Sequence, residues 1–208
     1  SKAIRKAFKK QGITLQTAHK TTNVEKTKDG VKATLADAND ESKTQTIEAD
    51  KVLVAIGVAG RFDGLFDDSL GVELYKDHIK AATSDGTYAT SVPGIYAIGD
   101  VIGPPWLAHV ASEEAVVCVE NIAGEHAHPL DYSAIPANTY CHPQVASVGL
   151  TEDQCQEQGL DYEVGNFPHT ALGMGQALGE TAGFTKMIKD KKHGEMLGCH
   201  MVGDNVTE

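Results

Sequence analysis

The sequence of 208 residues is poor in the features that mark several classes of protein. It has only four cysteines, and no two have the C-x-x-C spacing of a zinc knuckle or the C-x-x-x-x-C spacing of a local redox pair. We therefore expect reduced, mostly buried thiols. Positive charge is also scarce, with 18 basic residues against 29 acidic ones and a net charge of −11. This balance argues against nucleic acid and anionic membrane surfaces as partners, because both require clustered basic residues.

Long hydrophobic runs and phosphate loops are missing too. The longest apolar run, "VLVAIGVA" at 52–59, is far too short to cross a bilayer. The first residues lack the apolar segment of a signal peptide, so we expect a cytoplasmic protein, or a mitochondrial matrix protein if the source is eukaryotic. The glycine-rich segment 173–179 has the wrong spacing for a dinucleotide and is predicted to be a surface loop. His126 and His128 have no third ligand at fitting spacing, so no metal site is predicted.

The residues that are present predict a mixed α/β fold with a sizeable core. Hydrophobic residues make up 41% of the chain and charged residues 23%. Helices are predicted near the N-terminus up to Gly12, at 107–123 up to Gly124, and after a cap at Thr151. Asp29-Gly30 predicts a hairpin turn. Further strands are expected at 51–57, 78–82, 88–92, 95–98, 145–149, 160–169, 183–190 and 196–203.

Two of these elements carry more detailed expectations. The run 51–57 is continuously apolar, which is typical of a strand covered on both faces. The helix at 107–123 has the periodicity of an amphipathic helix. Its apolar face is predicted to consist of Val110, Ala111, Ala115, Cys118, Val119 and Ile122.

The stretch "SVPGIYAIGDVIGPPWLAHVASEE" at 91–114 holds the strongest candidate site. An apolar strand ends in Gly99-Asp100, and a helix begins near Leu107. Ligands of α/β proteins sit beyond the carboxyl ends of such strands, and a helix N-terminus favours a carbonyl oxygen or an anion. An ionised aspartate accepts hydrogen bonds from ligand hydroxyls. The pair suits a flat polar cofactor with a polyol tail, although a simple turn residue explains Asp100 equally well.

Several stretches resemble the pyridine-nucleotide disulfide oxidoreductases. "TSVPGIYAIGDVIGPPWLAHVASEE" is similar to their second flavin-binding motif, most closely in the branch that oxidises dihydrolipoamide. "YCHPQVASVGLTEDQ" and "LGCHMVGDNVTE" resemble their interface domain, and "VLVAIG" resembles the strand that closes their NAD domain. The resemblance implies the tail of a Rossmann-like NAD domain at 1–58 and a returning segment of the FAD domain at 59–130. It implies a partial α+β interface domain at 131–208.

The same resemblance implies cofactors, partners and roles. The cofactors are FAD and NAD, in a flavoprotein that oxidises protein-bound dihydrolipoamide to lipoamide. The partners are a second copy of the protein and the lipoyl-bearing subunits of 2-oxo acid dehydrogenase complexes or of the glycine cleavage system. Asp100 would bind the ribityl chain, while Gly57 and Thr21 would lie near NAD. The flavin ring would be lined by Trp106, Leu107, Ala108 and His109.

Other parts of such an enzyme are not found in this sequence. The family uses two glycine-rich phosphate loops, a C-x-x-x-x-C redox pair and a His-Glu acid/base pair. We therefore expect a C-terminal-side fragment, with no catalytic residue and a truncated interface domain, that is inactive alone. Its exposed strand edges predict self-association or partial order. Two alternatives remain open: a mercuric or glutathione reductase-like enzyme, and a non-catalytic dimerisation module.

Overall fold

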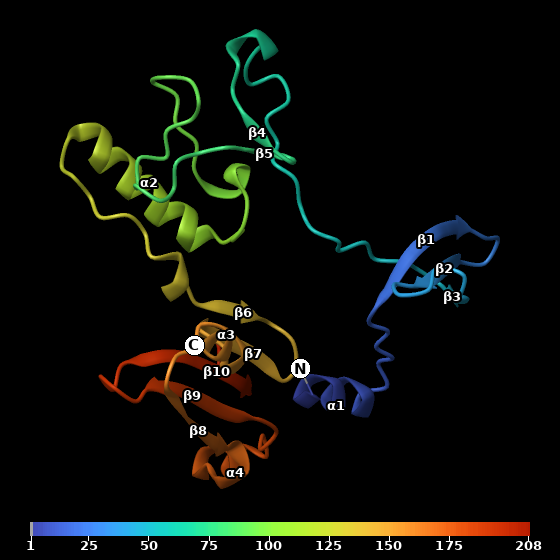
Figure 1. The fold of residues 1–208 in the computed structure, drawn as a ribbon. Coiled ribbons are helices and arrows are strands. Elements are labelled where there is room, and N and C mark those ends of the chain that lie inside the picture. The colour runs from blue at the N-terminus through green and yellow to red at the C-terminus, as the bar shows by residue number, and fades with distance from the viewer. Residues whose placement is uncertain (1) are drawn as a thin grey trace.

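The computed structural model describes residues 2–208, and Figure 1 shows three regions along the chain. A small sheet follows the N-terminal helix, a middle region of loops and short turns contains the helix α2, and a larger sheet forms the C-terminal part. Every strand pair among residues 2–208 is antiparallel. The predicted mixed α/β class is confirmed, although these sheets are not the parallel ones of a complete nucleotide-binding domain.

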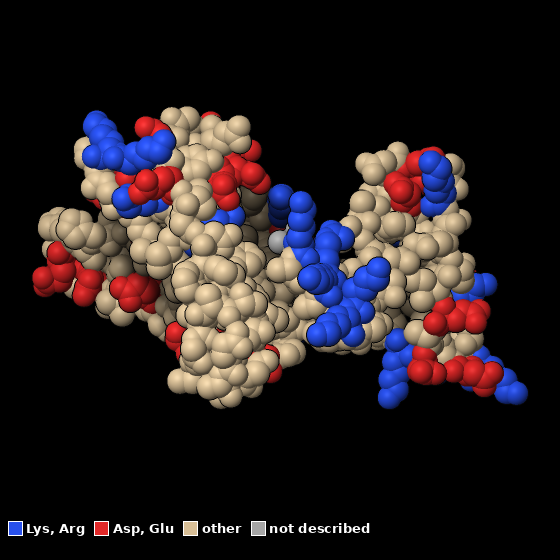
Figure 2. All heavy atoms as spheres, turned by 90° about the horizontal axis from the view of Figure 1, so that it is seen from below, with Lys and Arg blue, Asp and Glu red and all other residues tan. Residues whose placement is uncertain are grey.

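The N-terminal region consists of helix α1 (Lys2–Lys10) and a three-stranded sheet of order β1-β2-β3. The strands are β1 (His19–Lys26), β2 (Val31–Asp37) and β3 (Thr44–Ala49). The turn between β1 and β2 contains Asp29-Gly30, so the predicted hairpin is confirmed. Basic side chains gather on α1 in an otherwise acidic protein, as the blue group of Figure 2 shows.

The predicted buried strand at 51–57 is wrong. No strand is found between Ala49 and Leu74 among the described residues, and the side chains of Leu53 and Ile56 are 91% and 92% exposed. Figure 1 shows this part of the chain as an extended connection. A strand of this kind needs a hydrogen-bonded neighbour on each side and cover on both faces. Within residues 2–208, no strand pairs with it.

The central region is built around helix α2 (Ala108–Ala123). It begins with the 3₁₀ helix η1 (Asp68–Leu70) and the ribbon of β4 (Leu74–Tyr75) and β5 (His78–Ile79). The predicted strands at 88–92 and 95–98 are reduced to one bridge between Ala89 and Tyr96. A 3₁₀ turn, η2 (Gly99–Ile102), then leads to α2, which ends at Gly124 as predicted.

The core of this region differs in part from the predicted helix face. Val119 and Ile122 are 62% and 54% exposed, while Val117 and Glu114 are buried. The hydrophobic core of this region is centred on three buried residues, Tyr88, Val117 and Cys118. Each of the four cysteines is a free thiol, and all but the half-buried Cys141 are buried, which confirms the expected burial. Because the helix packs against few neighbours, its apolar stripe is narrower than the sequence pattern indicates.

The C-terminal region is a five-stranded antiparallel sheet of order β6-β7-β10-β9-β8. Its strands are β6 (Ala137–Thr139), β7 (Gln144–Gly149), β8 (Tyr162–Pro168), β9 (Phe184–Asp190) and β10 (Met196–Gly203). The 3₁₀ turn η3 (Tyr132–Ala134) precedes the sheet, and η4 (His169–Ala171) follows β8.

Two short helices connect the strands of this sheet. Thr151 caps α3 (Glu152–Glu157) in a reciprocal capping box with Gln154, which confirms the predicted cap. The predicted loop at 173–179 contains a short helix, α4 (Gly173–Leu178). Ile188, on strand β9 between β10 and β8, is completely buried. None of the helices in residues 2–208 has both the length and the hydrophobicity needed to cross a membrane.

Candidate functional site

Gly99 fixes the Gly99-Asp100 turn against the start of α2. Its backbone has a φ of +72°, a conformation that glycine adopts without strain. A Cβ at this position would lie 3.2 Å from the Cβ of Ala111, so the turn and the helix are in close contact. The amide of Gly99 donates a hydrogen bond of 2.6 Å to the carboxylate of Glu114. Gly99, the residue before Asp100, therefore lies against the first two turns of α2.

Asp100 and the N-terminus of α2 offer groups of opposite polarity to a ligand. Asp100 is exposed, and its carboxylate accepts no hydrogen bond from residues 2–208. Leu107 occupies the cap position without a side-chain cap, so the amides of Ala108, His109 and Val110 have no partner within the described chain. These amides carry the partial positive charge of the helix end. Within the described chain, a hydrogen-bond acceptor at residue 100 and a set of donors at the start of α2 are thus both free.

Trp106 forms an aromatic wall next to this helix end. Its ring stacks on His78 of β5, with centroids 5.9 Å apart and planes inclined by 25°. Trp106 remains 40% exposed, and the Nε2 atom of His78 is buried without a hydrogen-bond partner in the described residues. Sequence reasoning found Trp106 but missed His78, because nothing in the chain order links β5 to the turn at 103–105.

A buried polar cluster lies behind the turn and was also missed. Glu114 is only 3% exposed, and its carboxylate accepts a hydrogen bond of 2.7 Å from the hydroxyl of Tyr132. That hydroxyl lies 3.3 Å from the hydroxyl of Tyr88. Burial, reinforced by the bond to Glu114, raises the pKa of Tyr132 well above its usual range, and burial also raises the pKa of Tyr88. Both phenols therefore stay protonated and can donate.

A signal for Glu114 does exist in the sequence. It lies four residues after Val110 and four before Cys118, and both of these are buried. Helical spacing therefore places it on the inward face of α2. The predicted apolar face consists of apolar residues alone and therefore omits Glu114. The cluster borders a concavity of about 410 Å³ that is also lined by Ile79 and Ile102.

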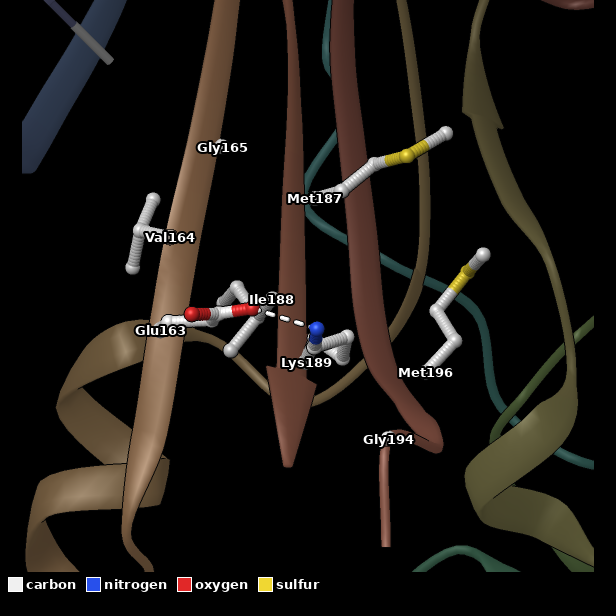
Figure 3. Close-up of a pocket in the computed structure, with 8 residues that line it drawn as sticks. All are labelled: Glu163, Val164, Gly165, Met187, Ile188, Lys189, Gly194 and Met196. Atoms are coloured by element: carbon white, nitrogen blue, oxygen red, sulfur yellow. Dashed lines mark ion pairs between the residues drawn. The ribbon is translucent and has the colours of Figure 1, made fainter. Parts of the chain in front are cut away.

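A second concavity, of about 430 Å³, lies on the C-terminal sheet and is shown in Figure 3. It is formed by β8, β9 and the start of β10, and its side chains include Val164, Met187 and Met196. Its charged side chains, Glu163 and Lys189, pair with each other. It contains none of the predicted site residues. Among residues 2–208, no cluster of His, Cys, Asp and Glu could hold a metal ion.

In the described part of the chain, the two residues predicted near NAD form no hydrogen bond with the candidate site at the turn 99–103 and α2. Gly57 has a φ of +118° and open space around it, and Thr21 is an exposed residue of β1. Within the described residues, no hydrogen bond joins either of them to the turn at 99–103 or to α2. Both assignments stay predictions.

Comparison with known proteins identifies the family. The sequence model described as "Pyridine nucleotide-disulphide oxidoreductase" matches residues 1–115, more than half of the chain. The chain belongs to the pyridine nucleotide-disulphide oxidoreductases. The model of the dimerisation domain of the same family matches residues 135–208. Membership of this family implies FAD and NAD as cofactors.

The curated relatives are dihydrolipoyl dehydrogenases. The chain is 48% identical to that of Rhizobium etli over 205 residues, which are 98% of this chain and 42% of the relative. It is 45% identical to that of Mycobacterium leprae, over 100% of this chain and 44% of the relative. The chain therefore spans less than half the length of the relatives that it matches.

Solved structures show the same fold. The crystal structure of LpdA from Mycobacterium tuberculosis matches with a TM-score of 0.85 and 23% identity, over 99% of this chain and 43% of that one. The Cu(II) complex of RclA from Escherichia coli, an HOCl-induced flavoprotein disulfide reductase, has a TM-score of 0.85 and 22% identity. That match covers 100% of this chain and 45% of the other. At this identity the likeness shows the fold alone.

The residues of the candidate site fit a flavin. The donor set is a row of helix amides, which suits the electron-rich carbonyl edge of the flavin ring. The acceptor is an exposed carboxylate, which suits the hydroxyls of its ribityl chain. Gly103, at the turn between Asp100 and Trp106, is buried and has a φ of +112°, a backbone conformation that glycine adopts without strain.

Proposed function

We propose that this chain is part of a dihydrolipoyl dehydrogenase, an enzyme that oxidises protein-bound dihydrolipoamide to lipoamide with NAD as the electron acceptor. Curated relatives of that name, 41% to 48% identical over almost the whole chain, support the proposal. The structural observation that supports it is the contact of Gly99, the residue before Asp100, with the first two turns of α2, whose N-terminus has no side-chain cap. The redox disulfide and the acid/base histidine would lie on residues outside this chain.

The chain would contribute binding groups rather than catalytic ones. When bound, FAD would supply two-electron transfer between a dithiol and NAD. Asp100 would accept hydrogen bonds from the ribityl hydroxyls. The amides at Ala108 and His109 would donate to the flavin ring near N1 and the C2 carbonyl, and the helix end would favour negative charge there. Trp106 and Leu107 would cover the ring and exclude water.

The other side of the cofactor chemistry would involve the N-terminal region. Gly57 would let NAD approach the backbone closely, since a Cβ is missing and the space around it is open. Thr21 would contact the adenine side through its backbone. We propose the domain limits 1–58, 59–130 and 131–208 for the NAD, FAD and interface parts.

The partners follow from the same proposal. Residues 135–208 match a dimerisation domain, which supports a homodimer. The substrates would be the lipoyl-bearing subunits of 2-oxo acid dehydrogenase complexes or of the glycine cleavage system, in the cytoplasm or the mitochondrial matrix. The family match over residues 1–115 speaks against an isolated dimerisation module.

The test is an Asp100→Asn variant of the full-length flavoprotein that contains this chain. Loss of the charge on one acceptor should weaken FAD binding by about ten-fold, because hydrogen bonds to charged groups are worth about 1.5–3 kcal/mol. The matched control is Asp63→Asn, an exposed aspartate of the same region. Equal FAD affinity in both variants would refute the site. Turnover with glutathione disulfide or mercuric ion, and none with dihydrolipoamide, would refute the substrate and favour the alternative reductases.

A further inference from the structure

We propose that Glu114 is a positioning residue that sets the geometry of the flavin site. The inference rests on the function proposed above and names a residue that neither the family match nor the sequence motifs assign. Glu114 does not face the ligand groups itself. It acts on them from behind, through the backbone amide of Gly99 and the hydroxyl of Tyr132.

The two oxygens of the Glu114 carboxylate are used by different segments. Oε2 accepts from the amide of Gly99 at 2.6 Å, and Oε1 accepts from the hydroxyl of Tyr132 at 2.7 Å. No basic side chain forms an ion pair with Glu114 within residues 2–208. A buried carboxylate is costly unless donors satisfy it, so both bonds are needed to keep it in the core.

The bond from the Gly99 amide to Glu114 is proposed to fix the position of Asp100. Gly99 comes directly before Asp100 in the chain. Its backbone is so close to α2 that a Cβ on Gly99 would lie 3.2 Å from the Cβ of Ala111. Glu114 and Ala111 belong to the same helix, whose N-terminus carries the free amides. The bond therefore holds the acceptor at Asp100 and the donors at the helix end as one unit. Without it, the turn could move relative to α2, and the two groups would no longer address one ligand.

The second bond links this unit to the rest of the chain. Tyr132 lies in η3, just before the residues that match the dimerisation domain, and Glu114 lies at the end of the other matched segment. The hydroxyl of Tyr132 is further held by the fully buried Tyr88. The Glu114 carboxylate is thus the point at which the turn, the helix and the entry to the C-terminal sheet are joined by side-chain bonds.

The experiment compares variants of the full-length flavoprotein. Glu114→Ala removes both bonds, Glu114→Gln keeps neutral polar atoms, and Tyr132→Phe removes only one donor. Glu113→Gln is the matched control, because Glu113 is exposed on the same helix. The readouts are the FAD dissociation constant, the reduction potential and absorption spectrum of bound flavin, and the melting temperature of the flavin-free protein.

We expect Glu114→Ala to weaken FAD binding by about ten-fold and to shift the flavin spectrum and potential. Glu114→Gln should restore part of the loss, and Glu113→Gln should match the unmodified protein. A role in packing alone would lower the melting temperature and leave the spectrum and potential of bound flavin unchanged, and that result would overturn the proposal. If Glu114→Ala does not fold, the same comparison is made with Glu114→Gln and Tyr132→Phe.

Asp100→Asn separates this inference from the proposed function. If Asp100→Asn leaves FAD binding unchanged, the flavin site itself is wrong. If Asp100→Asn weakens FAD binding while the Glu114 and Tyr132 variants do not, only the positioning role fails. Because Glu114 is proposed to act in part through Asp100, the double variant with Glu114→Ala should lose less affinity than the product of the two single losses. Full additivity would contradict that route.

Discussion

The exposed apolar segment 52–56 should make the 208-residue chain self-associate, and polar substitutions there should weaken the association. Leu53 and Ile56 are the most exposed large apolar residues of the described chain, at 91% and 92%. They lie in an extended stretch whose backbone groups pair with no strand among residues 2–208. An extended, apolar and unpaired segment is a template for pairing with another chain.

The size of the effect follows from the burial that association would provide. Burying an exposed leucine or isoleucine side chain stabilises by about 1.5–3 kcal/mol. The double variant Leu53→Asn/Ile56→Asn should therefore remove about 3–6 kcal/mol for each chain whose segment is covered. At about 1.4 kcal/mol for each factor of ten, the dissociation constant should rise by roughly a hundred-fold or more. Ordering of side chains at the contact reduces the gain, so we expect an increase near the lower end of this range.

The assay is sedimentation velocity of the isolated chain over a wide range of concentrations. The unmodified chain should show association that the double variant largely abolishes. The matched control is Leu65→Asn/Leu178→Asn, because these leucines are 71% and 58% exposed but lie outside the segment. A chain that stays monomeric throughout would refute the reasoning, as would equal association of the unmodified chain and the Leu53/Ile56 variant.

Other predictions concern stability. Ile188→Ala should lower the free energy of unfolding of the C-terminal sheet by about 2–5 kcal/mol, whereas Met187→Ala on the exposed side should change it little; denaturant titration distinguishes them. Thr151→Ala should cost about 1 kcal/mol by removing the cap of α3, and an unchanged denaturation midpoint would contradict the cap. Since the pKa of Tyr132 is raised above its usual 10.0, the stability it provides is present below pH 10.0 and is lost as the pH rises above that value. Tyr132→Phe should flatten this alkaline loss in unfolding titrations, and an identical pH dependence would refute it.

Local signals predicted the elements whose causes are local. The hairpin at Asp29-Gly30 needs only a turn that glycine permits, and the helix stop at Gly124 needs only a left-handed residue, with φ of +81°. The cap at Thr151 forms its bonds with Gln154, three residues away. None of these depends on distant parts of the chain. The sequence alone therefore predicts turns, helix stops and helix caps of this kind correctly.

The wrong predictions are those that depend on distant partners. The apolar runs at 51–57 and 95–98 have the composition of buried strands, but a strand forms only beside another strand. The first run has no paired neighbour in the described chain, and the second has a single bridge from Tyr96 to Ala89. The stripe on α2 was predicted too wide at Val119 and Ile122 for the same reason, since side-chain burial needs a covering element.

The site was half predictable. The order apolar run, Gly-Asp, helix predicts Asp100 next to α2, and the structure brings Gly99, its chain neighbour, into close contact with Ala111. The ligand role of Asp100 stays a prediction. The burial of Glu114 could not be predicted, because one of its donors, the hydroxyl of Tyr132, lies 18 residues further along the chain. A buried acid is acceptable only where its donors are known, and the donors here come from two separate segments.

The candidate site is suited to a ligand because Asp100 and the N-terminal amides of α2 do not hydrogen-bond to each other. An aspartate beside a helix N-terminus would ordinarily cap it, because its oxygen accepts from the first-turn amides. In the described chain α2 has no side-chain cap, and Asp100 does not bond to it. Glu114 takes up the Gly99 amide from behind and so fixes the turn without consuming either the acceptor or the donors. A ligand that reaches both then breaks no internal hydrogen bond, and its binding gains from groups that are already held in place.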